Sequence, residues 1–227
     1  MRYFRIQLFN KVLFWVLPGL LVFGCKKSGE PFSGPLNELK RYPYERFHLT
    51  YEYSGDVRGT EEMFVSGYGK YEARHSKFEI FSDQGVHASD NGSLSRLTDL
   101  YKIDYVLRRA LHEHSRPLDS LYHLNADNIP SPQAYLESEM QRNYFKNSGI
   151  DTMLGKPATR WQHADNIMTL WVWNGLLLRR QTSSAEGSLD MKIREIDTLW
   201  TVDTAKFSIP SGFTVTEEIR EHASDPN

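Results

Sequence analysis

Alternation of apolar and polar side chains is the feature that most constrains this chain, because a period of two is typical of strands and not of helices. Residues 47–53 place Phe, Leu and Tyr at odd positions and polar residues at even positions. Residues 189–194 repeat the pattern with Leu, Met and Ile against Asp, Lys and Arg. Both segments are therefore predicted to be strands with one buried face.

Short turn sequences separate the strand-like runs, at Ser54-Gly55-Asp56, Gly67-Tyr68-Gly69, Asp90-Asn91-Gly92 and Asn174-Gly175. Their spacing favours antiparallel strands joined by short loops. Asn174-Gly175 is the clearest, because Asn-Gly supplies the positive φ angles of a type I′ turn and strand-forming residues flank it. The sequence therefore predicts a β-hairpin around this dipeptide.

Helix signals are few and lie mainly in the middle of the chain. Ser131-Pro132 is typical of a helix start, and Gly149 of a helix end. Between them, apolar residues recur at helical spacing, at Leu136, Met140 and Tyr144. A shorter stretch, residues 105–113, is also predicted to be helical. A mainly antiparallel sheet with one or two inserted helices belongs to the α+β class, with the helices covering one face of the sheet.

Residues 1–24 have the composition of an export signal. They carry Arg2, Arg5 and Lys11 and no acid, followed by an apolar run that Pro18-Gly19 interrupts and Lys26-Lys27 closes. A membrane-spanning helix needs roughly 20 apolar residues. The run is shorter than that, so we interpret it as a removable signal peptide and not as a membrane span.

Cys25 directly follows this run, in the string Leu21-Val22-Phe23-Gly24-Cys25. The string resembles the lipobox of bacterial lipoproteins, with a bulky Phe23 as its one departure. The resemblance implies that the Cys25 thiol carries a lipid anchor, whereas the alternative is an ordinary buried cysteine. Because Cys25 is the only cysteine, the folded domain has no internal disulfide and depends on its core.

The remaining chain is predicted to be one globular domain on a tether. Residues 25–36, rich in Gly, Pro and Ser, form the lipidated tether, residues 37–220 the domain, and residues 221–227 a tail. Without residues 1–24 the chain has 24 Lys+Arg and 29 Asp+Glu, a net charge of −5. This mildly acidic balance gives no reason to expect a nucleic-acid partner.

No residue pattern points to catalysis, a metal or a cofactor. His112-Glu113-His114, with His123 nearby in sequence, is the sharpest metal candidate. Two imidazoles two residues apart share a face only on a strand, however, and this segment is predicted to be helical and lacks the His-Glu-x-x-His spacing. The acidic pair Glu61-Glu62 is interpreted as solvated. No Gly-x-Ser-x-Gly motif or Gly-rich phosphate loop is present.

Four sites share the pattern Asp, then Ser or Thr, then an apolar residue: Asp119-Ser120-Leu121, Asp151-Thr152-Met153, Asp197-Thr198-Leu199 and Asp203-Thr204-Ala205. The pattern resembles the O-glycan acceptor sites of Bacteroidota envelope proteins. Asp-Ser and Asp-Thr also begin turns simply through side-chain hydrogen bonds to the backbone. Both interpretations stay open at this point.

Several longer strings resemble LolA-like envelope proteins from Bacteroidota, which include carriers and acceptors of outer-membrane lipoproteins. The strings are residues 59–72, 154–156, 170–178 and 206–213. The resemblance implies a half-open antiparallel β-barrel, with helices lying in its concave face and an apolar cavity between them. Related carriers hold acyl chains there, and the group supplies no catalytic residues and no cofactor.

Two functions are therefore expected. The first is a non-enzymatic protein, anchored to the outer membrane through its lipid and facing the periplasm, that binds an acyl chain, a lipid or a lipoprotein. Its predicted cavity residues are Trp171, Trp173, Leu136, Met140 and Tyr144. The second is a structural or adaptor lipoprotein whose barrel is filled by its own side chains and which docks an envelope protein partner.

Overall fold

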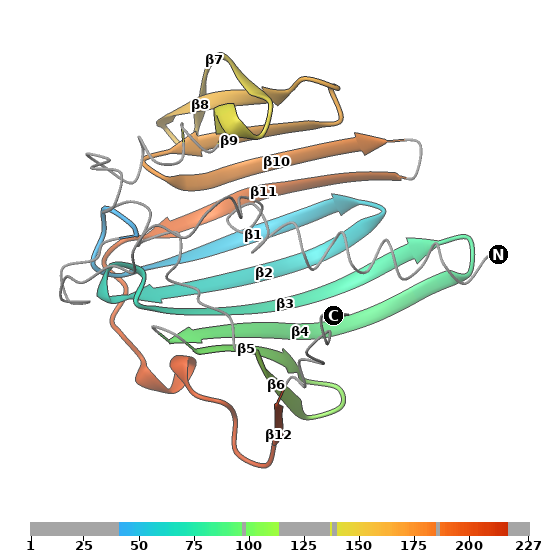
Figure 1. Cartoon of the computed structure of the whole chain (residues 1–227), viewed down its shortest axis with the longest axis vertical. Coiled ribbons are helices and arrows are strands. Elements are labelled where there is room, and N and C mark those ends of the chain that lie inside the picture. Colours follow the sequence, from blue (N-terminus) through green and yellow to red (C-terminus); the bar gives the residue numbers. More distant parts are fainter. Residues whose placement is uncertain (1–40, 97–98, 114–136, 138–139, 185–186, 218–227) are drawn as a thin grey trace, which may run out of the picture.

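The structure is a computed structural model, and it describes residues 41–96, 99–113, 137, 140–184 and 187–217 (Figure 1). These residues form one curved, open, twelve-stranded sheet in the order β12-β6-β5-β4-β3-β2-β1-β11-β10-β9-β8-β7. Neighbouring strands are antiparallel except at one edge, where β12 pairs with β6 in parallel. The described fold is therefore a mixed sheet with β12 and β7 as its edge strands.

The strands are numbered in their order along the chain. Their bounds are Phe47–Gly55 (β1), Val57–Ser66 (β2), Tyr71–Ser82 (β3), Gly85–Arg96 (β4), Asp99–Asp104 (β5), Arg109–Glu113 (β6), Phe145–Met153 (β7), Lys156–His163 (β8), Met168–Trp173 (β9), Leu176–Ser184 (β10), Gly187–Asp197 (β11) and Thr214–Glu217 (β12). The described residues also contain two 3-10 segments, Gly67–Gly69 (η2) and Thr204–Phe207 (η3).

Two meanders, β1 to β6 and β7 to β11, join where β1 pairs with β11. In this pairing Tyr51 lies opposite Ile193 and Tyr53 opposite Met191. Directly opposed residues share a face of the sheet. The apolar residues of β1 and β11, the two strands that alternation predicted, are therefore buried on the same side. We call this side the tyrosine face, defined by Leu49, Tyr51, Tyr53, Met63, Met191 and Ile193, all of which are buried.

The opposite face of β2 to β6 is covered by the chain that follows β11. Phe207 of η3 packs in a buried apolar cluster with Phe64, Leu94 and Ile103. Trp200 lies beside Phe64, with ring centroids 5.3 Å apart. Arg96 Nε donates a hydrogen bond to the carbonyl of Phe207 at 2.8 Å, which fixes η3 against β4. This face is thus closed by the protein's own apolar side chains.

The predicted hairpin is confirmed. Asn174 and Gly175 both have positive φ, 46° and 77°, and they connect β9 to β10. The turn predicted at Ser54-Gly55-Asp56 joins β1 to β2, and the turn at Gly67-Tyr68-Gly69 joins β2 to β3. The turn predicted at Asp90-Asn91-Gly92 is wrong, because all three residues lie inside β4. A Cβ at Gly92 would lie 2.5 Å from the carbonyl oxygen of Arg74, so glycine there permits a close approach of β3.

The structure corrects the shorter predicted helix and the end of the longer one, whose start lies outside the described residues. Residues 105–113 form a turn followed by β6, because the Asp104 carboxylate accepts a hydrogen bond from the Leu107 backbone N–H and Arg108 takes a φ of 51°. Of the longer predicted helix, residues 140–142 are helical, Tyr144 has a φ of 64°, and β7 begins at Phe145. Gly149 therefore lies in a strand, at an irregularity in the pairing of β7 with β8, and does not end a helix.

Helices covering the concave face are not supported by the described residues, which contain almost no helix. The α+β expectation is thus replaced there by a mostly-sheet architecture. In the described part of the chain, no helix is long and apolar enough to cross a membrane. Cys25, Leu136, the tether and the tail lie outside the described residues.

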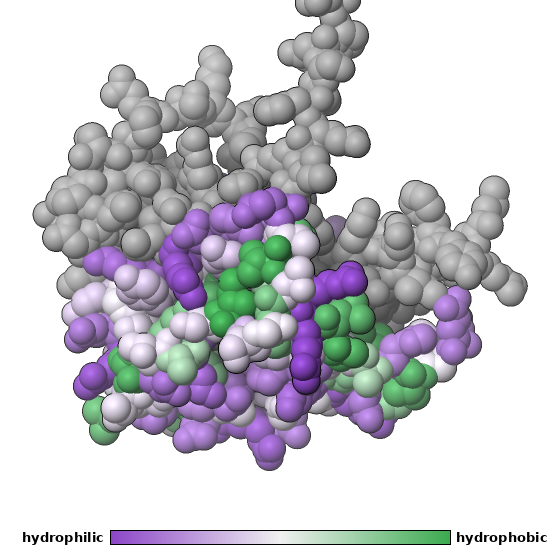
Figure 2. Space-filling view, turned by 90° about the horizontal axis from the view of Figure 1, so that it is seen from below, coloured by the Kyte–Doolittle hydropathy of each residue, from purple (hydrophilic) through white to green (hydrophobic). Residues whose placement is uncertain are grey.

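Seen from below, at the end of the sheet that carries β12 in Figure 1, hydrophobic side chains form separate patches with polar side chains between them (Figure 2). This view shows no continuous apolar band among the coloured residues. Buried polar side chains gather instead on the tyrosine face, where Glu61, Glu72, Ser76 and Arg180 all lie.

Candidate functional site

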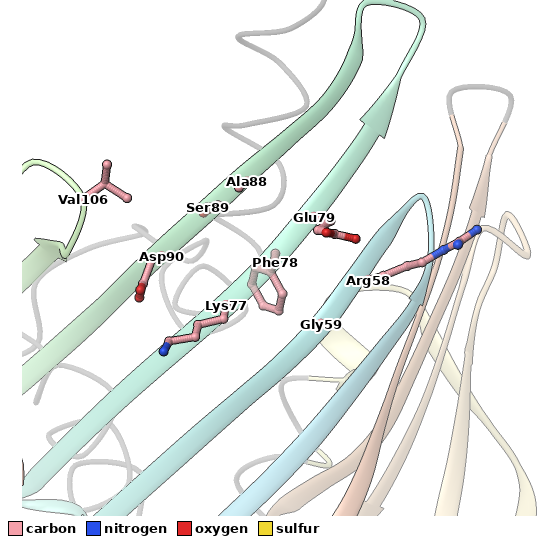
Figure 3. Close-up of a pocket in the computed structure, with 9 residues that line it drawn as sticks. All are labelled: Arg58, Gly59, Lys77, Phe78, Glu79, Ala88, Ser89, Asp90 and Val106. Atoms are coloured by element: carbon pink, nitrogen blue, oxygen red, sulfur yellow. The ribbon is translucent and has the colours of Figure 1, made fainter.

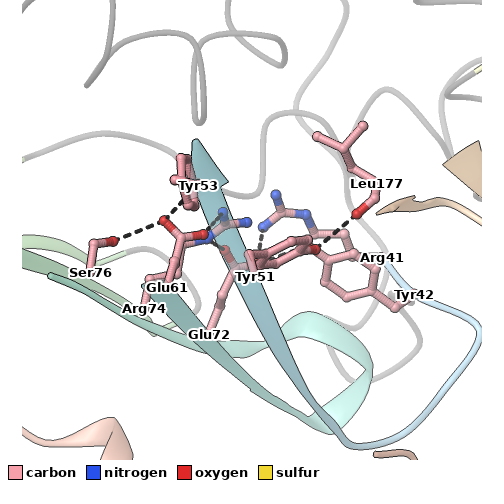
Figure 4. A network of polar contacts seen from close by, with 9 residues as sticks. All are labelled: Arg41, Tyr42, Tyr51, Tyr53, Glu61, Glu72, Arg74, Ser76 and Leu177. Atoms are coloured by element: carbon pink, nitrogen blue, oxygen red, sulfur yellow. Dashed lines mark hydrogen bonds and ion pairs between the residues drawn. The ribbon is translucent and has the colours of Figure 1, made fainter. Parts of the chain in front are cut away.

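The tyrosine face carries a buried network of charged and hydroxyl side chains (Figure 4). Glu72 on β3 is one of its two acidic centres. Its carboxylate accepts hydrogen bonds from Arg74 Nε at 2.8 Å, Tyr42 Oη at 2.9 Å and Arg41 Nη1 at 3.1 Å. Three donors therefore compensate a carboxylate that is only 7% exposed.

Glu61 on β2 is the second acidic centre and is 3% exposed. It accepts hydrogen bonds from Ser76 Oγ at 2.9 Å, Arg74 Nη1 at 3.2 Å and Tyr53 Oη at 3.4 Å. The β2–β3 register places Glu61 directly opposite Ser76, which explains why these side chains meet. Arg74 thus bridges both carboxylates.

The environment fixes the charge states of the network. Burial alone would raise the pKa of Glu72, but the Arg41 and Arg74 guanidiniums, with hydrogen bonds from Arg74 and Tyr42, outweigh it and hold this pKa at about 2. Burial opposes the charge of Arg74, yet Glu72 and Glu61 raise its pKa well above the ordinary value. Burial raises the pKa of the Tyr42 and Tyr53 phenols, so both act as neutral donors.

A β-bulge in β10 lies next to this network. The pairing of β10 with β9 shifts between Leu177 and Arg179, and the Tyr51 hydroxyl donates a hydrogen bond to the Leu177 carbonyl at 2.9 Å. Bulges re-aim the side chains that follow them. Here the strand continues with Arg180, which turns to the tyrosine face opposite Met191.

Among the described residues of the tyrosine face, Arg180 stands apart because its guanidinium forms no hydrogen bond and no ion pair. It is 2% exposed, and its Nε has no hydrogen-bond partner. The residues directly across from it are both apolar, Met191 on β11 and Leu170 on β9. Burial lowers the pKa of Arg180, although Tyr53 and Glu61 act in the other direction. An arginine stays protonated even so.

The buried charges of the described network do not balance. Three guanidiniums, those of Arg41, Arg74 and Arg180, face two carboxylates, those of Glu61 and Glu72. Both carboxylates are already engaged by Arg41 and Arg74. This group of five side chains therefore carries one surplus positive charge, located on Arg180.

The structure separates the predicted cavity residues. Trp171 is 7% exposed, and its Nε1 donates a hydrogen bond to Asp151 at 2.6 Å. Trp173 is half-buried beside Tyr44, with ring centroids 5.9 Å apart. Trp171 and Trp173 share one side of β9, as expected from strand alternation. The two tryptophans therefore line a side of β9 that already holds partners from the chain itself.

Met140 packs on the other side of β9, in a buried cluster that contains Leu170 and Val172. Tyr144 is 74% exposed, and Leu136 lies outside the described residues. Trp171 belongs to the buried cluster that contains Tyr53 and Met191 of the tyrosine face, and Trp173 packs against it, whereas Met140 belongs to a separate cluster. The four described residues thus do not converge on one cavity, and Trp171 and Trp173 are the two that pack with the tyrosine face.

Two surface pockets lie away from these residues. The first has a volume of about 370 Å³ and lies across β2, β3 and β4, with Val106 at one end (Figure 3). Its charged residues are Arg58, Lys77, Glu79 and Asp90, two of each sign. The second, about 350 Å³, lies at the ends of β1, β9, β10 and β11. Neither is lined by a predicted cavity residue.

The sharpest metal candidate of the sequence, His112, lies on a strand, β6. Its ring contacts Asp99 at 3.3 Å and Glu217 at 2.9 Å, so that it joins β5, β6 and β12. His114 and His123 lie outside the described residues. Among the residues that are described, no group of three or more His, Cys, Asp or Glu is arranged to hold a metal ion.

Two of the Asp-Ser/Thr-apolar sites form turns. Asp197 accepts a hydrogen bond from the Leu199 backbone N–H at 2.8 Å, and Asp203 accepts one from Ala205 N–H at 3.0 Å at the start of η3. Asp151 instead lies inside β7, where it binds Trp171 and Arg160. Asp119-Ser120-Leu121 lies outside the described residues. Glycosylation of these sites stays a prediction.

Sequence reasoning missed the buried network, although a signal for it was present. Glu61 occupies an odd position between Val57 and Met63, and odd positions of this segment face inward. Interpreting Glu61-Glu62 as a solvated pair was therefore wrong for Glu61 and correct in direction for Glu62, whose side chain is 44% exposed. Inward acids and arginines on neighbouring strands could have indicated a buried ionic cluster.

Comparison with known proteins gave structural neighbours only. No known family model matches the sequence, and no curated protein is significantly similar to it. Similar solved structures include an uncharacterized conserved protein from Thermus thermophilus, with a TM-score of 0.48, 9% identity, and coverage of 80% of this chain and 93% of that chain. LprF from Mycobacterium bovis gives a TM-score of 0.34, 11% identity, and coverage of 76% and 91%.

A LolA superfamily protein from Nitrosomonas europaea gives a TM-score of 0.24 and 9% identity, with coverage of 76% of this chain and 93% of that chain. The structural neighbours thus include LprF and a LolA superfamily member, at low sequence identity. Because all of these TM-scores lie below 0.5, they carry no conclusion about the function of this chain.

Proposed function

We propose that this chain is a lipid-anchored envelope protein that binds an acyl-chain ligand, either a lipid or the lipid moiety of a lipoprotein, on the tyrosine face of its sheet. The anchor is Cys25, and the protein faces the periplasm from the outer membrane. It performs no catalysis and takes no cofactor. The LolA-like sequence strings motivate the ligand class, and the tyrosine face supplies the site.

The observation that carries the proposal is the unpaired Arg180 on an otherwise apolar and internally paired face. Burying a charge without a partner is unfavourable, and well-packed apolar residues generally stabilise a core at least as well as buried ions do. The opposite face of the same sheet follows that rule, with Phe64, Leu94 and Phe207. The buried charge on the tyrosine face is therefore better explained by ligand binding than by a contribution to folding stability.

Native mass spectrometry of the full chain, purified from its own host, tests the proposal. We expect a non-covalent adduct with the mass of a lipid, released by collisional activation. The matched control is Cys25→Ala, which removes the covalent lipid and keeps the tyrosine face. An adduct that disappears in Cys25→Ala, or no adduct in either form, contradicts ligand binding on that face.

The anchor has a separate test, because it concerns a different residue. Metabolic labelling with a fatty acid should label the wild-type chain and leave Cys25→Ala unlabelled, since thioether formation needs the sulfur and Cys25 is the only cysteine. Label that persists on Cys25→Ala would show that the lipobox interpretation is wrong. This result leaves the proposal for the tyrosine face unaffected.

A second candidate is an adaptor whose core is filled by its own side chains and which docks an envelope protein. The packing of Trp171 and Met140 favours it, because both were predicted to line an open cavity and both are less than 10% exposed. Absence of any co-purifying lipid, together with a stable protein complex isolated from the host envelope, would establish this candidate over the first.

A further inference from the structure

We propose that Arg180 is the counter-ion for an anionic head group, so that the ligand of the tyrosine face is a singly charged acidic amphiphile. The inference rests on the proposed function and narrows it, because it states what chemistry the ligand presents. The group it recognises is a carboxylate or a phosphodiester, each with one negative charge, attached to an apolar chain.

The first step of the argument is the number of buried charges. Glu61 already accepts hydrogen bonds from Tyr53, Arg74 and Ser76, and Glu72 from Tyr42, Arg41 and Arg74. Arg180 forms no ion pair with an acid of the described residues, and its buried Nε has no acceptor. One further negative charge would neutralise this group of buried side chains, and a dianion would reverse the imbalance.

The second step concerns geometry. A guanidinium presents its N–H donors in a planar fork, which matches the two oxygens of a carboxylate or a phosphate. Tyr53 lies in the same row of the face, because Tyr53 and Arg180 are both directly opposite Met191, one on each side of β11. The Tyr53 proton is already donated to Glu61, so an acidic group that enters this row would be bound by the Arg180 guanidinium.

The third step concerns the rest of the ligand. Met191 and Leu170 flank Arg180 on the two neighbouring strands, and they belong to two different buried apolar clusters. A small hydrophilic anion would gain nothing from these side chains. Because Met191 and Leu170 are already 1% and 0% exposed, the gain for an acyl chain would come from its own apolar surface, at roughly 25 cal/mol per Å² removed from water. The surroundings of the charge thus select an amphiphile over a free ion.

Calorimetric titration of the full chain in one non-ionic detergent tests the inference. The probes are oleate and didodecyl phosphate as singly charged acidic amphiphiles, oleyl alcohol as the uncharged one, and acetate and inorganic phosphate as acids without a chain. We expect Arg180→Met to weaken binding of the preferred acidic amphiphile by about tenfold to a hundredfold, because a charge-assisted hydrogen bond is lost. The affinity for oleyl alcohol should change by less than about threefold in Arg180→Met. Arg180→Lys should retain part of the affinity for the acidic amphiphile.

Arg179→Met is the matched control. Arg179 is the preceding residue, its side chain is 27% exposed, and it already pairs with Asp190 at 2.6 Å, so its loss should leave binding of every probe unchanged. The apo Arg180→Met chain should unfold at the same or a higher denaturant concentration, because the substitution removes a buried unpaired charge. A folding defect therefore does not account for a loss of affinity.

The outcomes separate the inference from the proposed function. If oleate, didodecyl phosphate and oleyl alcohol all bind equally well and Arg180→Met affects none of them, the counter-ion role is wrong while acyl-chain binding stands. If no amphiphile binds the wild-type chain, both are wrong. Acetate or inorganic phosphate binding as tightly as the amphiphiles would show that the face takes a free anion, which also overturns the inference.

Discussion

The two faces of the sheet bury different kinds of side chain. The opposite face of β2 to β6 packs Phe64, Leu94 and Ile103 against Phe207 from the chain after β11. The tyrosine face of the same strands mixes apolar side chains with Glu61, Glu72 and Arg74, all buried or nearly so. A single strand, β2, thus has Phe64 on one side and Glu61 on the other.

The difference shows where stability and specificity reside. An apolar cluster contributes in proportion to the surface it removes from water, and neighbouring apolar residues can replace one another with small losses. A buried ionic network contributes little net stability, but it is sensitive to the loss of any one member. We therefore expect the stability losses caused by substitutions on the two faces to differ more in their dependence on pH than in their magnitude.

The largest effect is expected on the apolar face. Leu94→Ala should lower the free energy of unfolding by about 4 kcal/mol, because Leu94 is 1% exposed and its truncation leaves a cavity beside Phe64 and Phe207. Denaturant unfolding at pH 7 and pH 4 should give the same loss. Leu199→Ala, at a residue 85% exposed, is the control and should change stability by less than about 0.5 kcal/mol.

Removing a charge from the tyrosine face should give a smaller loss that depends on pH. Glu72 has a pKa of about 2 in the folded chain, below the usual value of about 4.3 in an unfolded chain. The stabilisation is therefore fully present above about pH 4.3 and is lost as the pH falls through about 2. At pH 7, Glu72→Gln should cost about 3 kcal/mol.

Unfolding curves between pH 7 and pH 2 check this prediction. The difference between wild type and Glu72→Gln should shrink as the pH falls. Glu62→Gln, at a neighbouring acid whose side chain is 44% exposed, should unfold like the wild type throughout. A Glu72→Gln loss that is constant over the whole range would show that the network is not ionised as described.

A third substitution tests the turn that holds β9 beside β10, and therefore Leu170 beside Arg180. Gly175 has a φ of 77°, a region in which a β-branched residue is strained. Gly175→Val should lower the free energy of unfolding by about 1 to 2 kcal/mol, measured by the denaturant midpoint. Asn174→Gly is the control, because glycine tolerates positive φ. A comparable loss of stability in this control would show that backbone strain at Gly175 is not the cause.

Period-two alternation predicted the centre of the sheet from the sequence. The odd-numbered apolar residues of β1 and β11 meet across the central pairing, Tyr53 with Met191 among them. The method failed where strands lack alternation. Residues 145–153 have a buried residue only at each end, Phe145 and Met153, so that no period-two signal competed with the helical spacing of Leu136, Met140 and Tyr144.

The candidate site was less predictable, for a physical reason. Glu61, Glu72, Arg74 and Arg180 lie on three strands, and their proximity depends on register and on a bulge in β10. Alternation within one strand shows which way a residue points, but not which residue lies opposite it. Trp171 and Trp173 stand out in the sequence because aromatic side chains contribute large apolar surfaces, whereas a charged residue at an inward position is easily interpreted as solvated.

The smallest expected effect concerns the edge of the sheet, where an ionic contact is exposed instead of buried. A hydrogen bond from His112 to Glu217 raises the pKa of His112, burial opposes this, and Asp99 adds to it. Because the folded pKa is raised above the unfolded value of about 6.5, the contact stabilises β12 below about pH 6.5 and is lost as the pH rises through the raised value. The side chains of Asp99 and Glu217 are 48% and 60% exposed, so the gain should not exceed about 0.5 kcal/mol.

An NMR titration of the His112 ring should give a pKa above about 6.5 that falls in Glu217→Gln. Since β12 is the one parallel strand of the described sheet and is held by this contact at Glu217, a ring pKa unchanged by Glu217→Gln would indicate that backbone pairing alone attaches the edge.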